Sequence, residues 1–168
     1  MKTIQATSKG MAYLIKVDDS DYENVSRFKW SIKQERDGLY AVRNTLKKDG
    51  KKRIYMHHEI VGKPPLGMVI DHKDCDGLNN QRSNLRFATK SQNGANRGYE
   101  IRNTSGFKGV SWDVKRDKWQ VGIQINKHRF ALGRFTDIND AARAYDAAAR
   151  KHFGEFANLN FKEAKSKA

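Results

Sequence analysis

Residues 68–97 read "MVIDHKDCDGLNNQRSNLRFATKSQNGANR" and set the organisation of the N-terminal half of the chain. Within residues 69–80 alone there are three aspartates, one histidine and two asparagines. The whole chain of 168 residues carries a formal net charge of +14. Oxygen ligands concentrated in one turn of so basic a protein raise the question of whether the turn binds a metal ion.

A calcium loop is the first interpretation. Asp74, Asp76 and Gly77 occupy the third, fifth and sixth positions of an EF-hand frame. The first and twelfth positions would be His72 and Ser83, where the loop needs an aspartate and a bidentate glutamate, so this interpretation fails. The second interpretation is a solvated turn without chemistry, because Asp and Asn side chains commonly hydrogen-bond to local backbone groups. This interpretation stays open for Asp76 and Gly77.

A nuclease turn is the third interpretation. Hydrolysis of a phosphodiester needs a divalent cation beside the phosphate and a base for the attacking water. Magnesium prefers oxygen ligands, and a histidine suits the base. Asp71 and His72 are adjacent at the end of an expected strand, so their side chains should leave opposite faces of it. One of these two side chains could then bind the metal ion while the other accepts a proton from the attacking water.

The quoted stretch resembles the HNH endonuclease motif, the ββα-metal fold, in the variant found in phage and intron-encoded homing endonucleases. The resemblance implies that His72 is the general base, that Asp71 and Asn93 are metal ligands, and that Asn84 braces the loop and orients the base. It also implies Mg²⁺ or another divalent cation such as Mn²⁺. A strand ending at His72, a loop, a short strand "LRFA" and a helix opening near Thr89 would let Asn93 face Asp71.

The preceding segment "YMHHEIVGKPPLG" resembles the lead-in helix and loop of the same variant. His57 stands where that family often carries a histidine, and it could approach the scissile phosphate. An ordinary packed or capping histidine is an equal alternative. Neither His57 nor His58 is therefore assigned a catalytic role.

Composition indicates a folded nucleic-acid-binding protein. The excess of Lys and Arg favours a polyanionic partner, and it is +7 in residues 1–93 and +7 again in residues 94–168. The single cysteine, Cys75, permits no internal disulfide, which favours a reducing, intracellular setting. Neither a membrane span nor a secretory signal is indicated. We expect the cytoplasm or nucleoid of a bacterial host, with a phage or mobile element as the source.

The segment 94–106, "GANRGYEIRNTSG", is typical of a linker. We predict a nuclease domain at 1–96, a linker at 97–106, a DNA-binding domain at 107–161 and a basic tail at 162–168. Before the linker, "MAYLIKVD" predicts a strand and "DSDYENVSRF" a capped helix. Residues 29–58 predict strands joined at "RDG" and "KDG" turns. "IYMHHEIVG" predicts a helix that ends at Gly62.

After the linker, "WQVGIQI" (119–125) alternates apolar and polar residues, as a strand with one buried face does. "HRFALG" repeats the pattern with Phe130 and Leu132 inward, and "FKGVSW" is a third strand. A helix should begin at Thr136 or Asp137 and end at Gly154. The prediction is a three-stranded antiparallel sheet packed on one helix, with the other sheet face open.

The segment 107–161 resembles the APETALA/ethylene-response-factor type of DNA-binding domain through "KGV", the alternating strand, "LGRF", "AARAYDAAARKHFG" and "ANLNF". In that family the open sheet face enters the major groove of DNA. Core packing is favoured for Trp119 and Phe130, whereas Trp112 either stacks on the sugar-phosphate chain or covers the sheet edge. The resemblance implies DNA contacts from Lys108, Ser111, Gln124 and Arg129, with Gln120, Lys118 and Arg116 as weaker candidates. Separately, the basic linker is expected to follow the DNA backbone through Arg97 and Arg102.

Together these inferences predict an α+β protein that cuts duplex DNA at a specific site, as homing endonucleases do. It would act as a monomer with one divalent cation and leave 5′-phosphate and 3′-hydroxyl ends. The alternative is a non-catalytic DNA-binding regulator with a relic nuclease domain. An RNA-binding module is weaker, because no aromatic pair is expected on the open sheet face. Target sequence and single- or double-strand cutting stay open.

Overall fold

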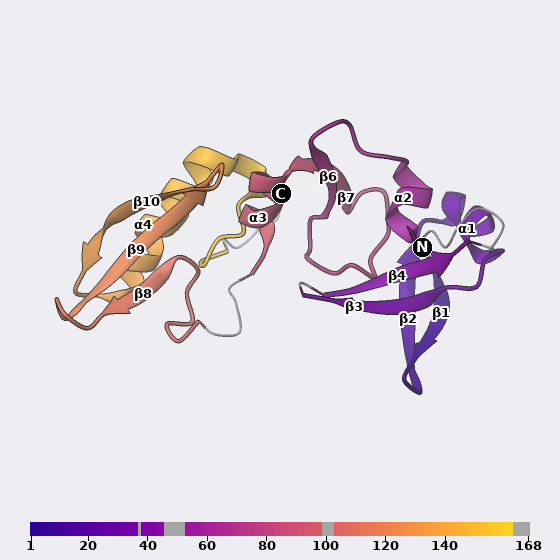
Figure 1. Ribbon diagram of the computed structural model, residues 1–168, viewed down its shortest axis with the longest axis horizontal. Helices are drawn as coiled ribbons and strands as arrows, with labels where there is room; N and C mark the ends of the chain where they lie inside the picture. Colours follow the sequence, from indigo (N-terminus) through magenta and orange to yellow (C-terminus); the bar gives the residue numbers. More distant parts are fainter. Residues whose placement is uncertain (37, 46–52, 99–102, 163–168) are drawn as a thin grey trace, which may run out of the picture. The chain divides into compact units, whose positions relative to one another are not determined.

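The computed structural model describes residues 1–36, 38–45, 53–98 and 103–162. The chain forms two compact units, Met1–Thr89 and Lys90–Ala168 (Figure 1). Both combine helices with small antiparallel sheets, three sheets in the first unit and one in the second among the described residues, which confirms that the chain is α+β. Among the described residues no helix is long and apolar enough to cross a membrane.

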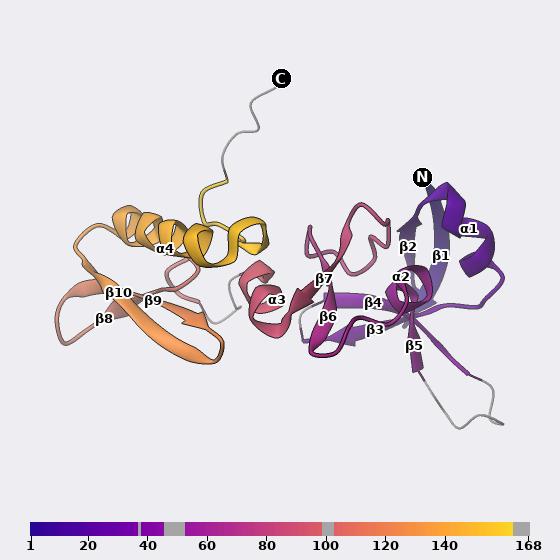
Figure 2. The same ribbon diagram turned by 90° about the horizontal axis from the view of Figure 1, so that it is seen from above.

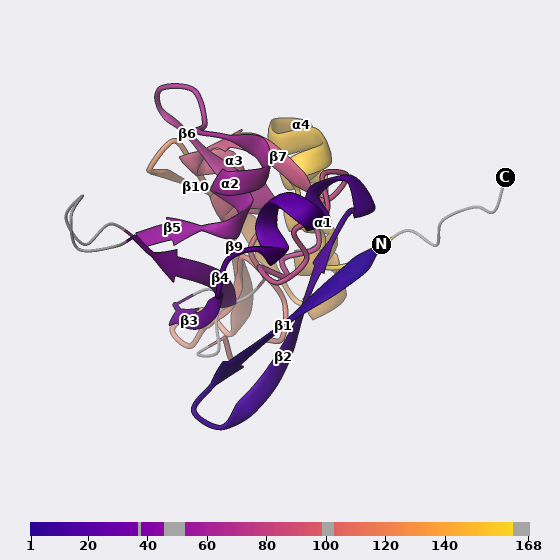
Figure 3. The same cartoon turned by 90° about the vertical axis from the view of Figure 1, so that its right-hand side faces the viewer.

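The first unit begins with a β-hairpin that the sequence did not reveal. β1 (Lys2–Ser8) pairs in antiparallel register with β2 (Met11–Val17), as Figure 3 shows. The two-residue connection is Lys9 and Gly10, with φ of 50° and 79°. Positive φ at both positions matches the twist that a tight hairpin needs. The polar composition of β1 concealed it, because only Ala6 of this strand is buried.

The remaining elements of this unit follow the predicted order. α1 spans Asp19–Ser26, and a three-stranded sheet is formed by β3 (Ser31–Glu35), β4 (Gly38–Asn44) and β5 (Arg53–Tyr55) in that order. α2 (Met56–Val61) ends at Gly62, which has a φ of 78°. β6 (Met68–His72) then pairs with β7 (Leu85–Thr89). Asp37 of the "RDG" turn and the whole "KDG" turn lie outside the described residues.

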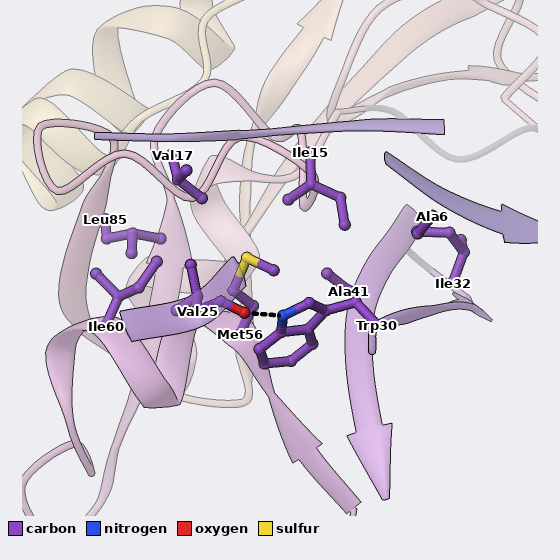
Figure 4. Packing of buried hydrophobic residues seen from close by; sticks show 10 residues of the cluster. All are labelled: Ala6, Ile15, Val17, Val25, Trp30, Ile32, Ala41, Met56, Ile60 and Leu85. Atoms are coloured by element: carbon purple, nitrogen blue, oxygen red, sulfur yellow. Dashed lines mark hydrogen bonds between the residues drawn. The ribbon is translucent and has the colours of Figure 1, made fainter. Parts of the chain in front are cut away.

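One apolar cluster joins these elements into a single core (Figure 4). Trp30 lies in it and donates its indole N–H to the carbonyl oxygen of Val25 at 2.7 Å. A buried polar hydrogen needs such a partner, so this bond fixes the indole against α1. The core therefore connects the hairpin, α1 and α2 to the strand that follows the acidic loop, and its buried members are Ala6, Ile15, Val17, Val25, Trp30, Ile32, Ala41, Met56, Ile60 and Leu85.

The second unit contains a helix on a sheet. β8 (Val110–Asp113), β9 (Lys118–Ile125) and β10 (His128–Phe135) pair in the order β10–β9–β8, and α4 (Ile138–Phe153) packs on one side of them, as Figure 2 shows. Asp137 caps α4 by accepting from the N–H groups of Asn139 and Asp140. Buried alanines on the inner stripe let the helix approach the sheet closely, as the sequence predicted.

One inward position differs from the prediction. Phe130 was expected in the core, but its side chain is 50% exposed. Phe130 pairs with the buried Ile123 and therefore lies on the α4 side of the sheet, before the β-bulge between Ala131 and Gly133. It is exposed there because β10 is an edge strand, with a neighbouring strand on one side only. Leu132, by contrast, packs against the core as expected.

The C-terminal segment closes this unit. After α4 comes the short helix η2 (Gly154–Phe156), and the chain then returns toward the start of the domain. The buried carboxylate of Asp146 accepts from the backbone N–H groups of Asn160 and Phe161, at 2.8 and 2.9 Å. Asn160 Oδ1 accepts in turn from the N–H of Lys108 at 2.7 Å. The predicted tail beyond residue 162 lies outside the described residues.

The helix α3 (Lys90–Asn96) follows β7 without an intervening residue and belongs to the second unit. Ala95 lies in the core of that unit, and its carbonyl oxygen accepts from the N–H of Asn158 at 3.1 Å. Ser91 Oγ accepts from the N–H of Asn126 at 3.0 Å. The helix that completes the HNH-like stretch in sequence is thus packed with the C-terminal module.

Candidate active site

Asp71 and His72 end the strand β6 and are almost completely buried, with 3% and 6% of their surfaces exposed. The register of the β6–β7 pair sets Asp71 opposite Arg86 and His72 opposite Leu85. Arg86 Nε donates to Asp71 Oδ2 at 2.8 Å. A buried carboxylate needs such compensation of its charge, so the cross-strand arginine allows an acidic side chain to be held in this position.

The loop after His72 is shaped by Asn84 and Asp74. Asn84 Nδ2 donates to Asp74 Oδ1 and to the carbonyl oxygen of Asn79, both at 2.8 Å. Asn84 Oδ1 accepts from the N–H of Asp74 at 3.1 Å. Asn79 Nδ2 donates to the other oxygen of Asp74 at 2.7 Å. These bonds close the loop on itself, with the Asn84 side chain at their centre.

The charge state of Asp74 reflects these bonds. Burial acts to raise its pKa, but the hydrogen bonds from Asn79, from the N–H of Asp76 and from Asn84 outweigh that effect and lower the pKa. Asp76 in turn accepts from the N–H of Leu78 at 3.0 Å. Asp74 and Asp76 therefore act as turn-forming acceptors, as the solvated-turn interpretation expects for Asp76.

The far end of the loop is fastened to the N-terminal helix. Arg82 donates from Nε and Nη2 to the two oxygens of Asp21, at 2.8 and 2.7 Å, and again from Nη2 to the carbonyl oxygen of Ile60. Gln81 Nε2 donates to Asp18 Oδ1 at 3.0 Å. A bidentate arginine–carboxylate pair fixes direction as well as distance. α1 and α2 thus hold the loop in register behind the Asp71–His72 pair.

His72 lies among aromatic rings. Its ring centroid is 5.8 Å from that of Tyr40 and 5.2 Å from that of His57, both in edge-to-face arrangement. Burial lowers the pKa of His72, although the nearby Asn80 side chain and the charge of Asp74 act in the opposite direction. The imidazole is consequently neutral at physiological pH, and a neutral imidazole can accept a proton.

His57 packs against His72. Its ring stacks on Tyr55 at 5.3 Å and lies 4.8 Å from His58. Burial, together with the charges of the neighbouring histidines, lowers the pKa of His57 to about 3. His57 is therefore a neutral packing group at physiological pH, in keeping with the packed-histidine alternative.

The two proposed metal ligands are oxygen donors. Asp71 offers a carboxylate, and Asn93 offers a side-chain amide from α3. Among the described residues no group of three or more His, Cys, Asp or Glu side chains is arranged to hold a metal ion. Magnesium keeps several of its waters and needs only one or two carboxylates, so the chemistry of Asp71 and Asn93 suits this ion.

The predicted DNA contacts divide into two groups. Cross-strand partners place Ser111 beside Gln120 and Gln124 beside Arg129, so these four share one face of the sheet β8–β9–β10. Val121 and Ile123 of β9, with the opposite orientation, are buried against α4. The open face anticipated from the alternating strand is therefore present. Trp112 is paired with Trp119, 4.8 Å between ring centroids, and lies on the other face, the side on which Val121 is buried.

Lys108 and the linker arginines differ from that group. The ammonium of Lys108 donates to backbone carbonyls of Gly94, Ala95 and Arg97, at the end of α3. A cation is favourable at the C-terminus of a helix, so Lys108 caps the end of α3 in the structure without DNA. Arg97 is exposed after the helix, and Arg102 lies outside the described residues.

Several site residues were missed in the sequence. Arg86 could have been predicted, because it lies on the strand that pairs with β6, directly opposite Asp71. Arg134 lies opposite Gln120 on the open sheet face and donates to Asp113 Oδ2 at 3.0 Å. Tyr40 carries no signal of its own in the sequence, since only the packing of β4 brings it to His72.

Comparison with known proteins shows the family to which this chain belongs. The model of the HNH endonuclease family matches residues 54–95, which include α2, β6, β7 and most of α3. An uncharacterized HNH endonuclease of Acanthamoeba polyphaga mimivirus is 30% identical over 158 residues, covering 94% of this chain and 79% of the relative. Protein 3.8 of Escherichia phage T7 is 32% identical over 111 residues, covering 65% of this chain and 89% of the relative. No solved structure gives a significant match. The chain therefore belongs to the HNH endonuclease family.

Proposed function

We propose that this protein is a site-specific DNA endonuclease of the homing type, which hydrolyses phosphodiester bonds with one divalent metal ion and a histidine base. The observation that carries the proposal is the buried His72 directly beside the buried Asp71 at the end of β6. In a chain of the HNH endonuclease family, this pair combines an acceptor for the proton of water with an oxygen ligand for a cation.

In the proposed reaction, His72 takes a proton from a water molecule as the water oxygen forms a bond to phosphorus. The bond between phosphorus and the 3′ oxygen of the preceding nucleotide breaks, and this oxygen takes a proton from solvent water, so the products carry a 5′-phosphate and a 3′-hydroxyl. Asp71 and Asn93 would hold Mg²⁺ or Mn²⁺, which when bound neutralises charge on the phosphate and on the leaving oxygen. Asn84 keeps the loop closed so that Asp71 and His72 stay in position.

We further propose that the sheet β8–β9–β10 anchors the enzyme in the major groove of its target. Arg129 and Gln124 form a cross-strand pair on the open face, and Ser111, Gln120 and Arg134 form a neighbouring row. Arg can grip guanine with two hydrogen bonds and Gln can do so with adenine. The linker, through Arg97 and Arg102, would follow the phosphate backbone. Two dissimilar modules can read an asymmetric site, so we expect a monomer.

The nuclease proposal is tested by incubating the protein with supercoiled plasmid that carries the DNA flanking its own gene. We expect nicking or cutting with Mg²⁺ or Mn²⁺ and none with EDTA. DNA binding without cleavage across metal and salt conditions would instead favour the second candidate, a DNA-binding regulator with a relic nuclease domain. Tighter binding of RNA than of duplex DNA in competition would overturn both.

The DNA-binding face is tested separately by gel-shift measurements. Arg129→Ala should weaken binding to the target by about 5- to 150-fold, as loss of a bidentate base contact does. Arg143→Ala is the matched control, because Arg143 is exposed on α4, on the other side of the sheet. Equal effects of the two substitutions would show that general charge, and not the sheet face, determines binding.

A further inference from the structure

α4 covers one face of the sheet β8–β9–β10 (Figure 2), and the opposite face carries an arginine that is held by an aspartate. The arginine is Arg134, which lies opposite Gln120 on β9, and Gln120 in turn lies opposite Ser111 on β8. Asp113 comes two residues after Ser111 on the same strand, so its side chain lies on the same face. Both members of this ion pair therefore belong to the face that we propose to enter the groove of DNA.

The side chain of Arg134 reaches across the central strand. Arg134 is on β10 and Asp113 is on β8, the two edges of the sheet, and β9 lies between them. Arg134 Nε donates to Asp113 Oδ2 at 3.0 Å. The side chain of Arg134 is therefore held over β9, along the surface of the sheet. It is nevertheless 44% exposed, so a ligand that approaches this face can contact it.

A second arginine fixes the aspartate. Arg116, in the turn after β8, donates from Nη1 to the same oxygen of Asp113 at 3.2 Å. The side chain of Asp113 is only 11% exposed in contact with these two arginines. The hydrogen bond from Arg134, together with that from Arg116, lowers the pKa of Asp113 against the effect of desolvation. Asp113 is therefore an ionised acceptor that groups of the protein itself hold in place.

The position of this bond on the guanidinium decides what Arg134 can still bind. An arginine reads guanine through two N–H groups, which meet the O6 and N7 acceptors in the major groove. In Arg134 the aspartate occupies Nε, and within the described part of the chain neither Nη1 nor Nη2 donates to an acceptor. These two nitrogens form the end of a rigid planar fork. A carboxylate at Nε thus fixes the direction of the fork and leaves its end for a base.

We propose that Arg134 reads a guanine of the target duplex and that Asp113 is its positioning residue. The inference rests on the proposed DNA-anchoring role of the sheet and names the base that one residue of that sheet recognises. A long side chain loses rotamer freedom when it binds, and this loss opposes binding. Because Asp113 already restricts Arg134, less of the loss remains when DNA arrives.

The aspartate also favours a base over a phosphate as the partner of Arg134. A carboxylate repels a phosphate group, so an arginine paired with Asp113 attracts the DNA backbone less than an unpaired arginine does. The O6 and N7 acceptors of guanine carry no formal charge and do not meet this repulsion. Base contacts carry the sequence information in a protein–DNA complex, so the pair contributes to specificity.

The experiment determines which DNA sequences the full-length protein prefers. Bound duplexes are selected from a pool of randomised duplex DNA in EDTA, so the result does not depend on cleavage, and thermal unfolding shows that each variant is folded. We expect one G·C pair whose preference falls by about 5- to 150-fold in Arg134→Ala, while the other positions keep theirs. Arg143→Ala is the control, because it removes an equal charge from the exposed side of α4, and it should change no position.

Asp113→Ala gives a second test in which charge and positioning predict different results. Loss of a negative charge alone should tighten binding to every duplex and leave the preferences unchanged. Loss of the positioning residue should also relax the preference at the same G·C pair that Arg134→Ala relaxes. Asp113→Asn keeps an acceptor oxygen for Nε of Arg134, so it should retain more of this preference than Asp113→Ala does.

Two results with the variants would overturn the inference alone. If a folded Arg134→Ala variant keeps every preference of the wild type, the ion pair only ties the two edges of the sheet together. If it binds all duplexes more weakly by the same factor, Arg134 is a phosphate contact. A wild-type protein that selects no sequence from the pool would instead overturn the proposed DNA-anchoring role of the sheet, and the inference with it.

Discussion

The buried histidine His57 should make the stability of the first unit depend on pH. Its pKa is about 3 in the folded protein, compared with about 6.5 in an unfolded chain. Between these two values the unfolded state binds a proton that the folded state does not, so stability falls as pH decreases. The slope for one such group is about 1.4 kcal/mol per pH unit, which amounts to about 2–3 kcal/mol between pH 6.5 and 4.5.

His57→Phe should remove this loss. Phenylalanine can keep the stacking on Tyr55 but takes up no proton. We therefore expect the variant to lose about 2–3 kcal/mol less stability than the wild type over this pH interval. His72, whose pKa is also lowered by burial, is present in both proteins and gives a loss of the same sign in each.

The assay is urea unfolding at pH 6.5 and at pH 4.5, followed through the indole N–H signal of Trp30, which belongs to the core of the same unit. His128→Phe is the control, because His128 is exposed at the start of β10. It should follow the wild type. If His57→Phe loses as much stability as the wild type, then His57 is protonated in the folded protein and the reasoning from its burial is refuted.

Three further substitutions probe the loop, the packing of α4 and the end of α3. Asn84→Ala removes three side-chain hydrogen bonds and should cost about 3 kcal/mol in urea unfolding, whereas a cost below about 1 kcal/mol would show that the loop does not depend on it. Gly109→Ala should lower the free energy of unfolding by about 3 kcal/mol or more, since its Cβ would lie 2.1 Å from the ring of Tyr145 on α4. Gly106→Ala is the control, because Gly106 has a similar φ but open space around it, and it should cost clearly less. Equal costs would contradict the close packing at Gly109. Lys108→Met should speed amide hydrogen exchange in α3 and destabilise the second unit by about 1–2 kcal/mol, while Lys115→Met, at an exposed turn, should change neither.

Much of the fold could be predicted because local signals and packing agree. The alternation in residues 119–125 identified a strand with one buried face, and Val121 and Ile123 are buried as it requires. Asp137 and Gly154 bound α4 as helix caps should. The hairpin β1–β2 was only half visible, because polar residues dominate β1 and its role arises from contacts with distant parts of the chain.

The residues of the candidate site could be predicted where a sequence motif identifies them. They could not be predicted where only contacts between distant parts of the chain bring them to the site. Asp71 and His72 stood out as an adjacent pair at a strand end, and the structure places both in the interior. Asn80 resembled one more turn-forming asparagine, and only its burial against β2 distinguishes it. The exposure of Phe130 was not foreseen because alternation gives the face of a residue, opposite Ile123 as expected, but not that β10 is an edge strand.

The central claim is that His72 is the base of a metal-dependent nuclease, and it is tested most directly by separating binding from cleavage. Wild type and His72→Ala are compared for duplex binding and for cleavage of the same duplex in Mg²⁺, with His128→Ala as the control. We expect His72→Ala to bind as the wild type does and to cleave about 100- to 10,000-fold more slowly, with no cleavage by any of the proteins in EDTA. Cleavage by His72→Ala at the wild-type rate would contradict the account.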